Sequence, residues 1–362
     1  MQAARLTVRD VRARPVNVPV DPPLETASGT IGTAPFVLID VLTEEGVTGL
    51  GYVFCYTTTA LHPTARLAAN LADLLRGEPA IPAVVEGQLQ RHFRLLGPQG
   101  LTGMAAAGVN MALWDALAKA CRVPLATLLG AAPRPVPAYA SLRAMNPERV
   151  AAEAEAALGA GFIAMKLKVG SGDLAADLAA IRAVRRVAGD RTALMVDYNQ
   201  CLTVPEAIRR AAALDGEGLA WIEEPVQGDD DAGHAAVARE ARTPIQIGEN
   251  WWGPRDTARS LAAGASDCVM VDVAKIGGVG AWLRAAALAE AAGRPVSSHI
   301  FPHVSVHLLA AAPARHWLEY LDLEAPLLAR PLALERGHAL VPSRPGIGLE
   351  WNDEAVKRFL AD

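Results

Sequence analysis

The stretch Phe162-Ile-Ala-Met-Lys-Leu-Lys-Val169 decides the fold, because it reads as a buried strand with two lysines near its end. An ionisable side chain ends each of six later strand-like runs, at intervals of about two dozen residues, the length of one strand–helix unit. These side chains are Asp197, Glu223, Glu249, Asp272, His299 and Glu319. A (β/α)8 barrel collects the ends of all its strands around one mouth. We therefore expect these residues to share one pocket.

Composition limits the class of protein and its partners. A chain of 362 residues is long for one core, so two domains are expected. The net charge is −5 and there is no basic tract, which argues against nucleic acid as a partner. No run reaches the roughly 18 apolar residues that cross a membrane, so no membrane partner is expected. The spacing of Cys55, Cys121, Cys201 and Cys268 fits neither a thiolate metal site nor a disulfide framework, and we expect a cytoplasmic protein.

The order of the expected elements indicates an α/β protein. Residues 1 to about 55 read as strands, and three helical stretches follow them: Thr59–Arg76, Ala83–Leu95 and Leu101–Cys121. After a Pro-rich boundary near Gly130, strand and helix patterns alternate, which favours a barrel with a parallel sheet. An open doubly wound sheet is the alternative, but no Gly-rich phosphate loop follows its first strand. The predicted units are a first domain over 1–132, a barrel over 133–324 and a returning segment over 325–362.

Asp197, Glu223 and Glu249 end consecutive strand runs and predict a metal site. Hard carboxylate oxygens suit Mg²⁺, which keeps open positions for water or substrate. Zinc is disfavoured because no histidine stands in this trio. Any one of these carboxylates could be an ordinary polar residue at a loop entrance. Three in consecutive units favour one Mg²⁺ ion per subunit.

Lys166 and Lys168 predict a base for proton transfer, because residues i and i+2 of a strand point to the same face. Two neighbouring ammonium groups repel, so each is expected to lower the pKa of the other. A Schiff-base role for a lysine stays open as an alternative. On the ends of neighbouring strands, the carboxylate of Asp272 can orient the imidazole of His299, which gives a second base.

Four further side chains are expected around these bases. Asn199 shares a strand face with Asp197 and can reach ligand hydroxyls. Glu319 would donate a hydrogen bond if burial raises its pKa. His303 could line the pocket, whereas Lys275 is out of phase with its strand and is expected to orient the carboxylates from behind them.

Six short motifs resemble those of the enolase superfamily, in its mandelate racemase subgroup. They are Met195-Val-Asp-Tyr-Asn-Gln200, Trp221-Ile-Glu-Glu-Pro225, Gly248-Glu-Asn-Trp251, Lys275-Ile-Gly-Gly278, Ser297-Ser-His299 and His316-Trp-Leu-Glu319. The resemblance runs through nearly the whole chain, from Asn17-Val-Pro19 onward. It implies an α+β capping domain over the first unit and a modified (β/α)7β barrel of TIM type over the second.

The resemblance also implies a role for each matching residue. It assigns the Mg²⁺ ligands to Asp197, Glu223 and Glu249. Lys168 matches the base on one face of the substrate, and His299, paired with Asp272, matches the base on the other. The remaining matches are Lys166 as a contact of the substrate carboxylate, Glu319 as the acid that bonds to the enediolate, and Ser141 and Asn199 as substrate contacts.

The lid of the pocket should select the substrate. The positions implied to line it are Leu24, Ser28, Ile31, Phe54, Tyr56 and Leu321. This mainly apolar wall favours a mandelate-like acid with an aromatic or apolar side group. Glu25, Arg143 and His303 bring polar groups whose roles stay open, and they keep acid-sugar substrates possible.

The predicted function is Mg²⁺-dependent 1,1-proton transfer through an enediolate, in a racemase of a 2-hydroxy carboxylic acid. The first alternative is an acid-sugar dehydratase that uses the same chemistry. An alternative of another class is a barrel that binds acids without turnover. The expected partners are a small carboxylic acid and further copies of the chain, because relatives form dimers or octamers.

Overall fold

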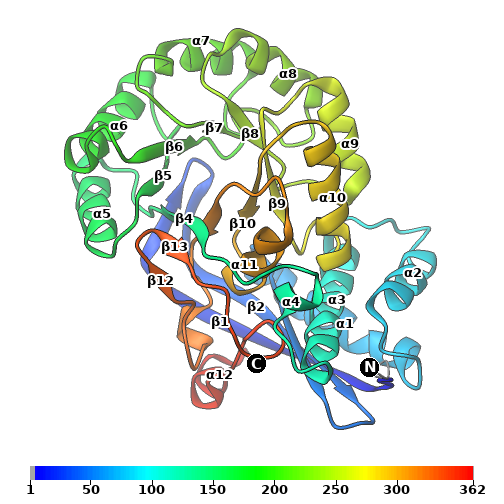
Figure 1. Ribbon diagram of the computed structural model, residues 1–362. Helices are drawn as coiled ribbons and strands as arrows, with labels where there is room; N and C mark the ends of the chain where they lie inside the picture. The colour runs from blue at the N-terminus through cyan, green and yellow to red at the C-terminus, as the bar shows by residue number, and fades with distance from the viewer. Residues whose placement is uncertain (1–4, 362) are drawn as a thin grey trace.

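The computed structural model describes residues 5–361, in which an antiparallel sheet with helices caps a barrel of parallel strands (Figure 1). The sheet has the order β1-β2-β3. Its strands are β1 (Val8–Thr26), β2 (Gly29–Thr43) and β3 (Thr48–Phe54). The helices that follow are α1 (Thr58–Leu75), α2 (Pro82–His92), α3 (Gly100–Ala120) and the short α4 (Leu125–Leu128). This layer is the α+β cap that the sequence predicts.

Strands and helices alternate through the next part of the chain. The strands are β4 (Val136–Ser141), β5 (Ala164–Lys168), β6 (Ala193–Asp197), β7 (Ile222–Glu223), β8 (Ile245–Ile247), β9 (Cys268–Asp272), β10 (Val296–His299) and β11 (Leu318–Tyr320). The helices between them are α5 (Pro147–Gly159), α6 (Leu174–Ala188), α7 (Val204–Leu214), α8 (Asp231–Glu240), α9 (Pro254–Ala263), α10 (Val279–Ala291) and α11 (Pro302–Ala311).

The parallel sheet closes into a barrel. Its strands pair in chain order from β4 to β10, and β11 pairs with β4. Between β10 and β11, the amide of Ser298 donates to the carbonyl of Trp317 at 3.0 Å. The helices lie on the outside of this ring (Figure 1). The fold is therefore the predicted (β/α)7β barrel of TIM type.

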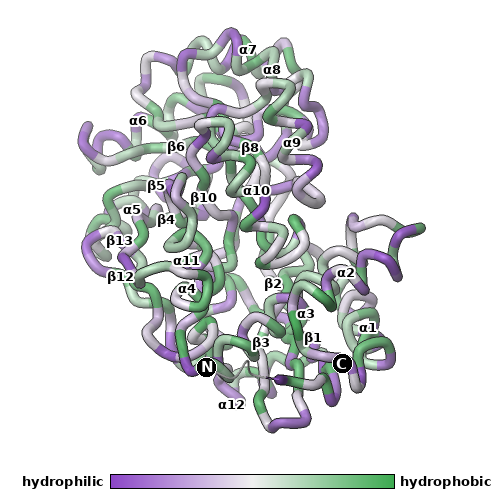
Figure 2. Tube along the Cα trace, turned by 45° about the vertical axis from the view of Figure 1, so that its right-hand side comes forward, coloured by the Kyte–Doolittle hydropathy of each residue, from purple (hydrophilic) through white to green (hydrophobic). Residues whose placement is uncertain are grey.

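Local chemistry explains where these elements lie. Helices α5, α6 and α8 each begin at a side chain that accepts a backbone N–H of the first turn, namely Asn146, Asp173 and Asp230. Strand interiors are apolar, and all of β9 is buried. Figure 2 shows hydrophobic segments along the strands and hydrophilic ones at many of the outer turns. In residues 5–361, no helix is both long enough and apolar enough to span a membrane.

The C-terminal segment runs back from the barrel to the cap. Its elements are a 3-10 helix (Ala325–Leu327), β12 (Leu334–Glu335), β13 (His338–Ala339) and α12 (Asp353–Phe359). β13 pairs antiparallel with the first two residues of β4, and Leu360 forms an isolated bridge with Val16 of β1. The boundaries near 132 and 324 stay predictions, and residues 1–4 and 362 of the predicted units lie outside the described residues.

Candidate active site

Ionisable side chains gather at one end of the barrel because several of them end its strands. Lys168, Asp197, Glu223, Asp272 and His299 are the last residues of β5, β6, β7, β9 and β10. Glu249 is the second residue after β8, and Glu319 lies within β11. All of these side chains are buried. Since strands of a parallel barrel point the same way, their ends bring these residues to one mouth.

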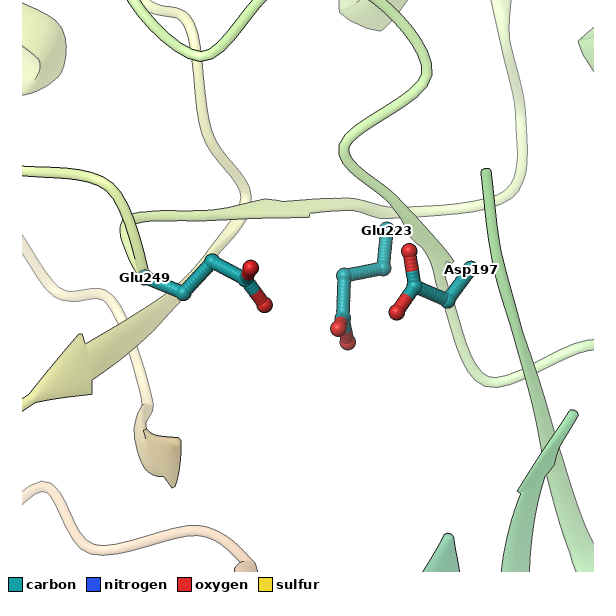
Figure 3. Close-up of side chains that lie close together, drawn as sticks. All are labelled: Asp197, Glu223 and Glu249. Atoms are coloured by element: carbon teal, nitrogen blue, oxygen red, sulfur yellow. The ribbon is translucent and has the colours of Figure 1, made fainter. Parts of the chain in front are cut away.

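Three carboxylates form a compact group at this mouth. One oxygen from each of Asp197, Glu223 and Glu249 lies within 4.8 Å of the others. Figure 3 shows the three side chains extending toward one another from their separate strand ends. The indole of Trp221 (3.0 Å) and the amide of Gln246 (3.1 Å) donate to Glu223 Oε2, which fixes this carboxylate in place.

The charges of this group suit a divalent cation. Burial raises the pKa of Glu223 well above its usual range, and the neighbouring charges of Asp197, Glu319 and Glu249 raise it further. Lys166 opposes this shift without cancelling it. A cation bound among the three carboxylates would relieve the repulsion between their negative charges. Oxygen donors without nitrogen or sulfur favour Mg²⁺ as that cation. The cluster could therefore hold Mg²⁺.

Both lysines contact carboxylates directly. Lys166 forms ion pairs with Glu223 and with Glu319, the latter at 2.8 Å, and Lys168 pairs with Asp197. Burial acts to lower the pKa of each lysine, but the adjacent carboxylates outweigh it and raise the pKa of both. Lys166 does act to lower the pKa of Lys168, as predicted, but the expected net lowering is wrong for this set of protein charges. A directly contacting carboxylate has more effect than the second ammonium group.

His299 and Asp272 form the expected pair. The Nδ1 of His299 lies 2.7 Å from Asp272 Oδ2, while its Nε2 lies 3.3 Å from Glu249 Oε2. The backbone amides of Ala274 and Lys275 donate to the other oxygen of Asp272 at 2.7 and 2.8 Å. Burial lowers the pKa of His299, but Glu249 and Asp272 outweigh that effect and raise it to about 9. The imidazole thus presents Nε2 to the carboxylate cluster.

Glu319 has a different charge state from the one expected. It pairs with Lys166, accepts the amide of Ile300 at 3.0 Å and lies 4.0 Å from His299 Nε2. Burial raises its pKa, but the positive charges of Lys166, His299 and Lys168 outweigh burial and lower it to about 2. The prediction of a raised pKa is therefore wrong, because Lys166 reaches Glu319 as well as Glu223.

The expected substrate contacts lie in different environments. Leu24, Phe54 and Leu321 are buried, and Ile31 and Tyr56 are half-buried. Ser28 is exposed at the turn between β1 and β2, where its amide donates to Thr26 Oγ1 at 3.2 Å. Two polar atoms near the carboxylates, Ser141 Oγ and Asn199 Oδ1, have no hydrogen-bond partner within residues 5–361.

Two of the side chains with open roles hold the lid against the barrel. Glu25 accepts the amide of Met145 at 2.9 Å and pairs with Arg149. Arg143 donates from Nη1 to the carbonyl of Pro22 at 3.2 Å, and its own carbonyl accepts the amide of Glu25 at 2.8 Å. These contacts join the end of β1 to the segment after β4.

His303 and Lys275 contact polar side chains other than the three carboxylates. His303 Nδ1 is 3.7 Å from Glu324 Oε1. The ammonium of Lys275 donates to Asn250 Oδ1 at 2.6 Å, and Asn250 in turn donates to both oxygens of Glu224, beside the cluster. Lys275 is thus linked to Glu224 through Asn250, and its role in orienting the three carboxylates stays a prediction.

Sequence reasoning missed three polar contacts of the site. Trp221 and Gln246 hold Glu223, and the hydroxyl of Tyr56 donates to Asp272 Oδ2 at 2.8 Å. Trp221 could have been found, since it shares a strand face with Glu223 at i and i+2. No pattern in the sequence indicates that a tyrosine of the first domain reaches Asp272.

Comparison with known proteins places the chain in a family. It matches the mandelate racemase / muconate lactonizing enzyme N-terminal domain over residues 8–130 and the enolase C-terminal domain-like family over residues 149–355. It is 35% identical over 339 residues to a 3,6-anhydro-alpha-L-galactonate cycloisomerase from Streptomyces coelicolor, with 90% of this chain and 91% of that protein covered.

Solved structures agree with this placement. An enolase from Bradyrhizobium, in complex with magnesium and mandelic acid, is 43% identical with a TM-score of 0.94, and 100% of both chains is covered. An L-talarate dehydratase from Polaromonas, in complex with Mg and L-glucarate, is 30% identical with a TM-score of 0.89, covering 99% of this chain and 98% of that one. Since both family domains match in order, the chain is an enzyme of the enolase superfamily and belongs to its mandelate racemase / muconate lactonizing enzyme family.

Proposed function

We propose that this enzyme is a Mg²⁺-dependent racemase of a 2-hydroxy carboxylic acid, acting by 1,1-proton transfer through an enediolate. One observation carries the proposal: two proton acceptors reach the carboxylate cluster from distant strands. Lys168 on β5 contacts Asp197, and Nε2 of His299 on β10 lies 3.3 Å from Glu249 Oε2. β4 and β11 separate these strands in one direction and β6 to β9 in the other. A carbon held at the cluster would have one acceptor on each face.

The difficult part of this reaction is the charge that accumulates on the substrate carboxylate when the C2 proton leaves. When bound by Asp197, Glu223 and Glu249, Mg²⁺ supplies a Lewis acid to that carboxylate. Lys166 would pair with the same group through its ammonium. Glu319 is close enough to Lys166 to reach the same oxygens, and it would donate a hydrogen bond there only after taking up a proton.

Lys168 and His299 would exchange roles between the two directions of the reaction. One removes the C2 proton, and the other returns a proton to the opposite face, which inverts the carbon. Asp272 holds the Nδ1 side of His299, so that Nε2 faces the carboxylate cluster, where the transfer would take place. Lys168 can accept a proton only as a neutral amine, which requires that the charge of Asp197 beside it be balanced.

The substrate side group would lie against the cap. Leu24, Phe54 and Leu321 offer a buried apolar wall, to which Ile31 and Tyr56 add partly buried surface. Such a wall favours an aromatic or apolar group over a chain of hydroxyls, because unpaired hydroxyls lose hydrogen bonds to water on burial. The relative from Bradyrhizobium with bound mandelic acid supports the same class of substrate.

Proton exchange tests the proposal. The enzyme is incubated in D₂O with Mg²⁺ and a panel of enantiopure 2-hydroxy acids, with mandelate as the first probe. Deuterium at C2 together with loss of optical activity is expected, and mass spectrometry and polarimetry measure the two quantities. Absence of C2 exchange across the panel would reject racemisation, and so would loss of water to a 2-keto acid, without racemisation, from panel members that carry a 3-hydroxyl.

Acid-sugar dehydration is the second candidate, and one cavity favours it. A space of about 430 Å³ adjoins Lys168 and is lined by both polar and apolar side chains. The polar ones include Glu25, Thr26, Thr30, Asn146 and Ser171. They could hydrogen-bond to several hydroxyls of a longer acid. The dehydratase from Polaromonas with bound L-glucarate shows that relatives of this fold accept such ligands. Screening aldonic and aldaric acids for 2-keto products separates the two reactions.

Two further expectations stay predictions. We retain a homo-oligomer, either a dimer or an octamer, and a cytoplasmic location. Sedimentation of the purified protein would measure the first, and fractionation of its source cells the second. A barrel that binds acids without turnover remains the alternative outcome of the exchange experiment.

A further inference from the structure

Tyr56 of the cap reaches the pair of residues that presents His299. Its hydroxyl donates to Asp272 Oδ2 at 2.8 Å, the same oxygen that lies 2.7 Å from His299 Nδ1. The other oxygen of Asp272 is held by backbone amides of the barrel. Tyr56 is thus the part of the cap that completes the hydrogen bonds of this buried carboxylate.

The ring of Tyr56 is held from two sides. The ammonium of Lys275 lies 4.1 Å from the ring centroid, and the ring of Phe54 packs at 4.6 Å between centroids. Lys275 also donates its backbone amide to Asp272. One residue of the barrel therefore contacts both the tyrosine and the carboxylate to which it bonds, which fixes the hydroxyl over Oδ2.

The backbone at Tyr56 is strained in the conformation that allows this contact. Its φ of +59° lies in the left-handed region, which bulky residues rarely adopt. Flanking hydrogen bonds hold the turn, from Cys55 N to Pro35 O at 2.8 Å and from Thr57 N to Cys55 O at 2.6 Å. Strain of this kind persists where surrounding contacts determine a functional geometry.

We propose that Tyr56 is a positioning residue through which the docked cap sets the orientation of His299, and so supports proton transfer on one face of the substrate only. Asp272 has one oxygen for both the imidazole and the phenol, so loss of the phenol frees Asp272 and His299 to shift together. Lys168, on the opposite side, makes no contact with this group of residues. The inference that Tyr56 supports proton transfer on one face rests on the function proposed above. The inference that it sets the orientation of His299 does not.

Tyr56→Phe tests the proposal because it removes the hydroxyl and keeps the ring. Tyr52→Phe is a matched control. Tyr52 is a buried tyrosine of β3, and its hydroxyl also donates to a carboxylate, but to Glu324 Oε1 at 2.8 Å and not to Asp272. The (R)- and (S)-enantiomers of mandelate are incubated separately in D₂O with Mg²⁺. We expect Tyr56→Phe to slow deuterium exchange of the enantiomer that His299 deprotonates by about tenfold or more.

The other enantiomer provides the decisive contrast. Lys168 removes the C2 proton of this enantiomer. In Tyr56→Phe, its deuterium exchange with retention of configuration should therefore continue at close to the wild-type rate. Its inversion should become slower, because inversion also requires His299. Tyr52→Phe should treat both enantiomers alike. Equal slowing of exchange for both enantiomers in Tyr56→Phe, or no slowing for either, would overturn the face-specific role.

A second measurement does not depend on turnover. In protein labelled with ¹⁵N-histidine, the signals of His299 are assigned by their loss in His299→Gln. We expect Tyr56→Phe, but not Tyr52→Phe, to shift the Nδ1 signal of His299. If wild-type enzyme exchanges neither enantiomer yet this shift occurs, the proposed function fails and the positioning role stands. An unchanged His299 signal in Tyr56→Phe rejects the positioning role in either case.

Discussion

Buried carboxylates of the same chemical type take different charge states at this barrel mouth. Burial acts to raise the pKa of Asp197, Glu223 and Glu319, yet the pKa of Asp197 falls because Lys168 and Lys166 are adjacent. Glu223 has one adjacent lysine but several negative neighbours, so its pKa rises. Glu319 combines Lys166 with His299, and its pKa falls to about 2. The balance between adjacent lysines and neighbouring carboxylates decides each case, as expected in a buried site.

The two proposed bases should act on opposite enantiomers. Lys168→Met and His299→Gln each remove one proton acceptor and keep a side chain of similar size. We expect each variant to lose racemisation by about a hundredfold or more. Each should also lose C2 exchange of one enantiomer and keep exchange of the other, as measured by ¹H NMR in D₂O. Lys357→Met, which changes an exposed lysine of α12, is the control.

Loss of exchange of the same enantiomer in both variants would contradict the assignment of one base to each face.

Glu249 should matter for metal affinity. Glu249→Gln replaces one charged oxygen donor of the cluster by a neutral amide, so Mg²⁺ affinity should fall by tenfold or more, which is about 1.4 kcal/mol or more. Isothermal titration calorimetry with MgCl₂ measures this without any substrate. Glu335→Gln, at an exposed position of β12, controls for loss of one negative charge. Unchanged Mg²⁺ affinity in Glu249→Gln would remove this residue from the site.

How much of the site could be predicted differs from residue to residue. The gathering of Asp197, Glu223 and Glu249 follows from a barrel that aligns its strand ends, so the spacing of residues was sufficient. The charge states of Lys166 and Glu319 depend on which carboxylate each ammonium contacts, and spacing does not contain that information. The role of Tyr56 depends on how a turn of the cap docks, which no local pattern encodes.

At the scale of elements, periodicity places helices well and their ends less well. The pattern over Ala83–Leu95 predicts a helix longer than α2, which ends at His92. Phe93 is buried, and the amides of Leu96 and Gly97 then turn back to its carbonyl at 2.9 and 2.8 Å. Gly97 has a φ of +84°, which ends the helical path. Leu95, the last residue of the pattern, and Leu96 after it are exposed where the chain has left the helix.

Close contact of β3 with α3 depends on glycine. A Cβ at Gly49 would lie 1.9 Å from the carbonyl oxygen of Ala112, and one at Gly51 would lie 2.4 Å from that of Gly108. Gly49→Ala should therefore lower the free energy of unfolding by about 2 to 3 kcal/mol or more, because backbone cannot move aside as a flexible side chain can. Urea denaturation followed by circular dichroism measures this change.

Gly32→Ala in β2 is the matched control, since a Cβ there meets no atom within 4 Å. It should change stability by less than about 0.5 kcal/mol. Equal effects of the two substitutions would show that the packing of β3 on α3 is not the cause.

At the scale of the whole molecule, single buried side chains join parts distant in sequence. Asp115 of α3 accepts the amides of Leu50 (2.8 Å) and Ile347 (2.7 Å), which links the helix to β3 and to the C-terminal segment. His307 of α11 accepts the amide of Ala126 on Nδ1 at 3.1 Å, and its Nε2 lies 3.2 Å from the carbonyl of Ile347. The alternation of elements predicts the barrel, but these links between units become visible only in the folded chain.

Acid should weaken the molecule through His307. Its bonds require a neutral ring, and burial together with His303 lowers its pKa from 6.5 to about 4. The unfolded chain binds the proton more readily, so this stabilisation is complete above about pH 6.5 and is lost as pH falls toward 4. The free energy of unfolding should drop by about 2 kcal/mol between pH 7.5 and pH 5 from this group.

The comparison of variants isolates that contribution. His307→Gln should show a flatter change of urea midpoint with pH than wild type, and His62→Gln, at an exposed site of α1, should keep the wild-type slope. A His307→Gln slope as steep as that of wild type would assign the acid sensitivity to other groups.

Residues with left-handed backbone follow several strands that carry site residues, as Tyr56 follows β3. Asn199 and Gln200 after β6, Glu224 after β7, and Ile300 and Phe301 after β10 all have φ between +35° and +66°. Such conformations are unfavourable for Gln200, Glu224 and Phe301 and above all for branched Ile300, whereas asparagine tolerates them at position 199. Glycine or asparagine at these positions of the rim should therefore raise the thermal stability of the enzyme. The same substitutions should slow catalysis, because these turns orient the reactive side chains.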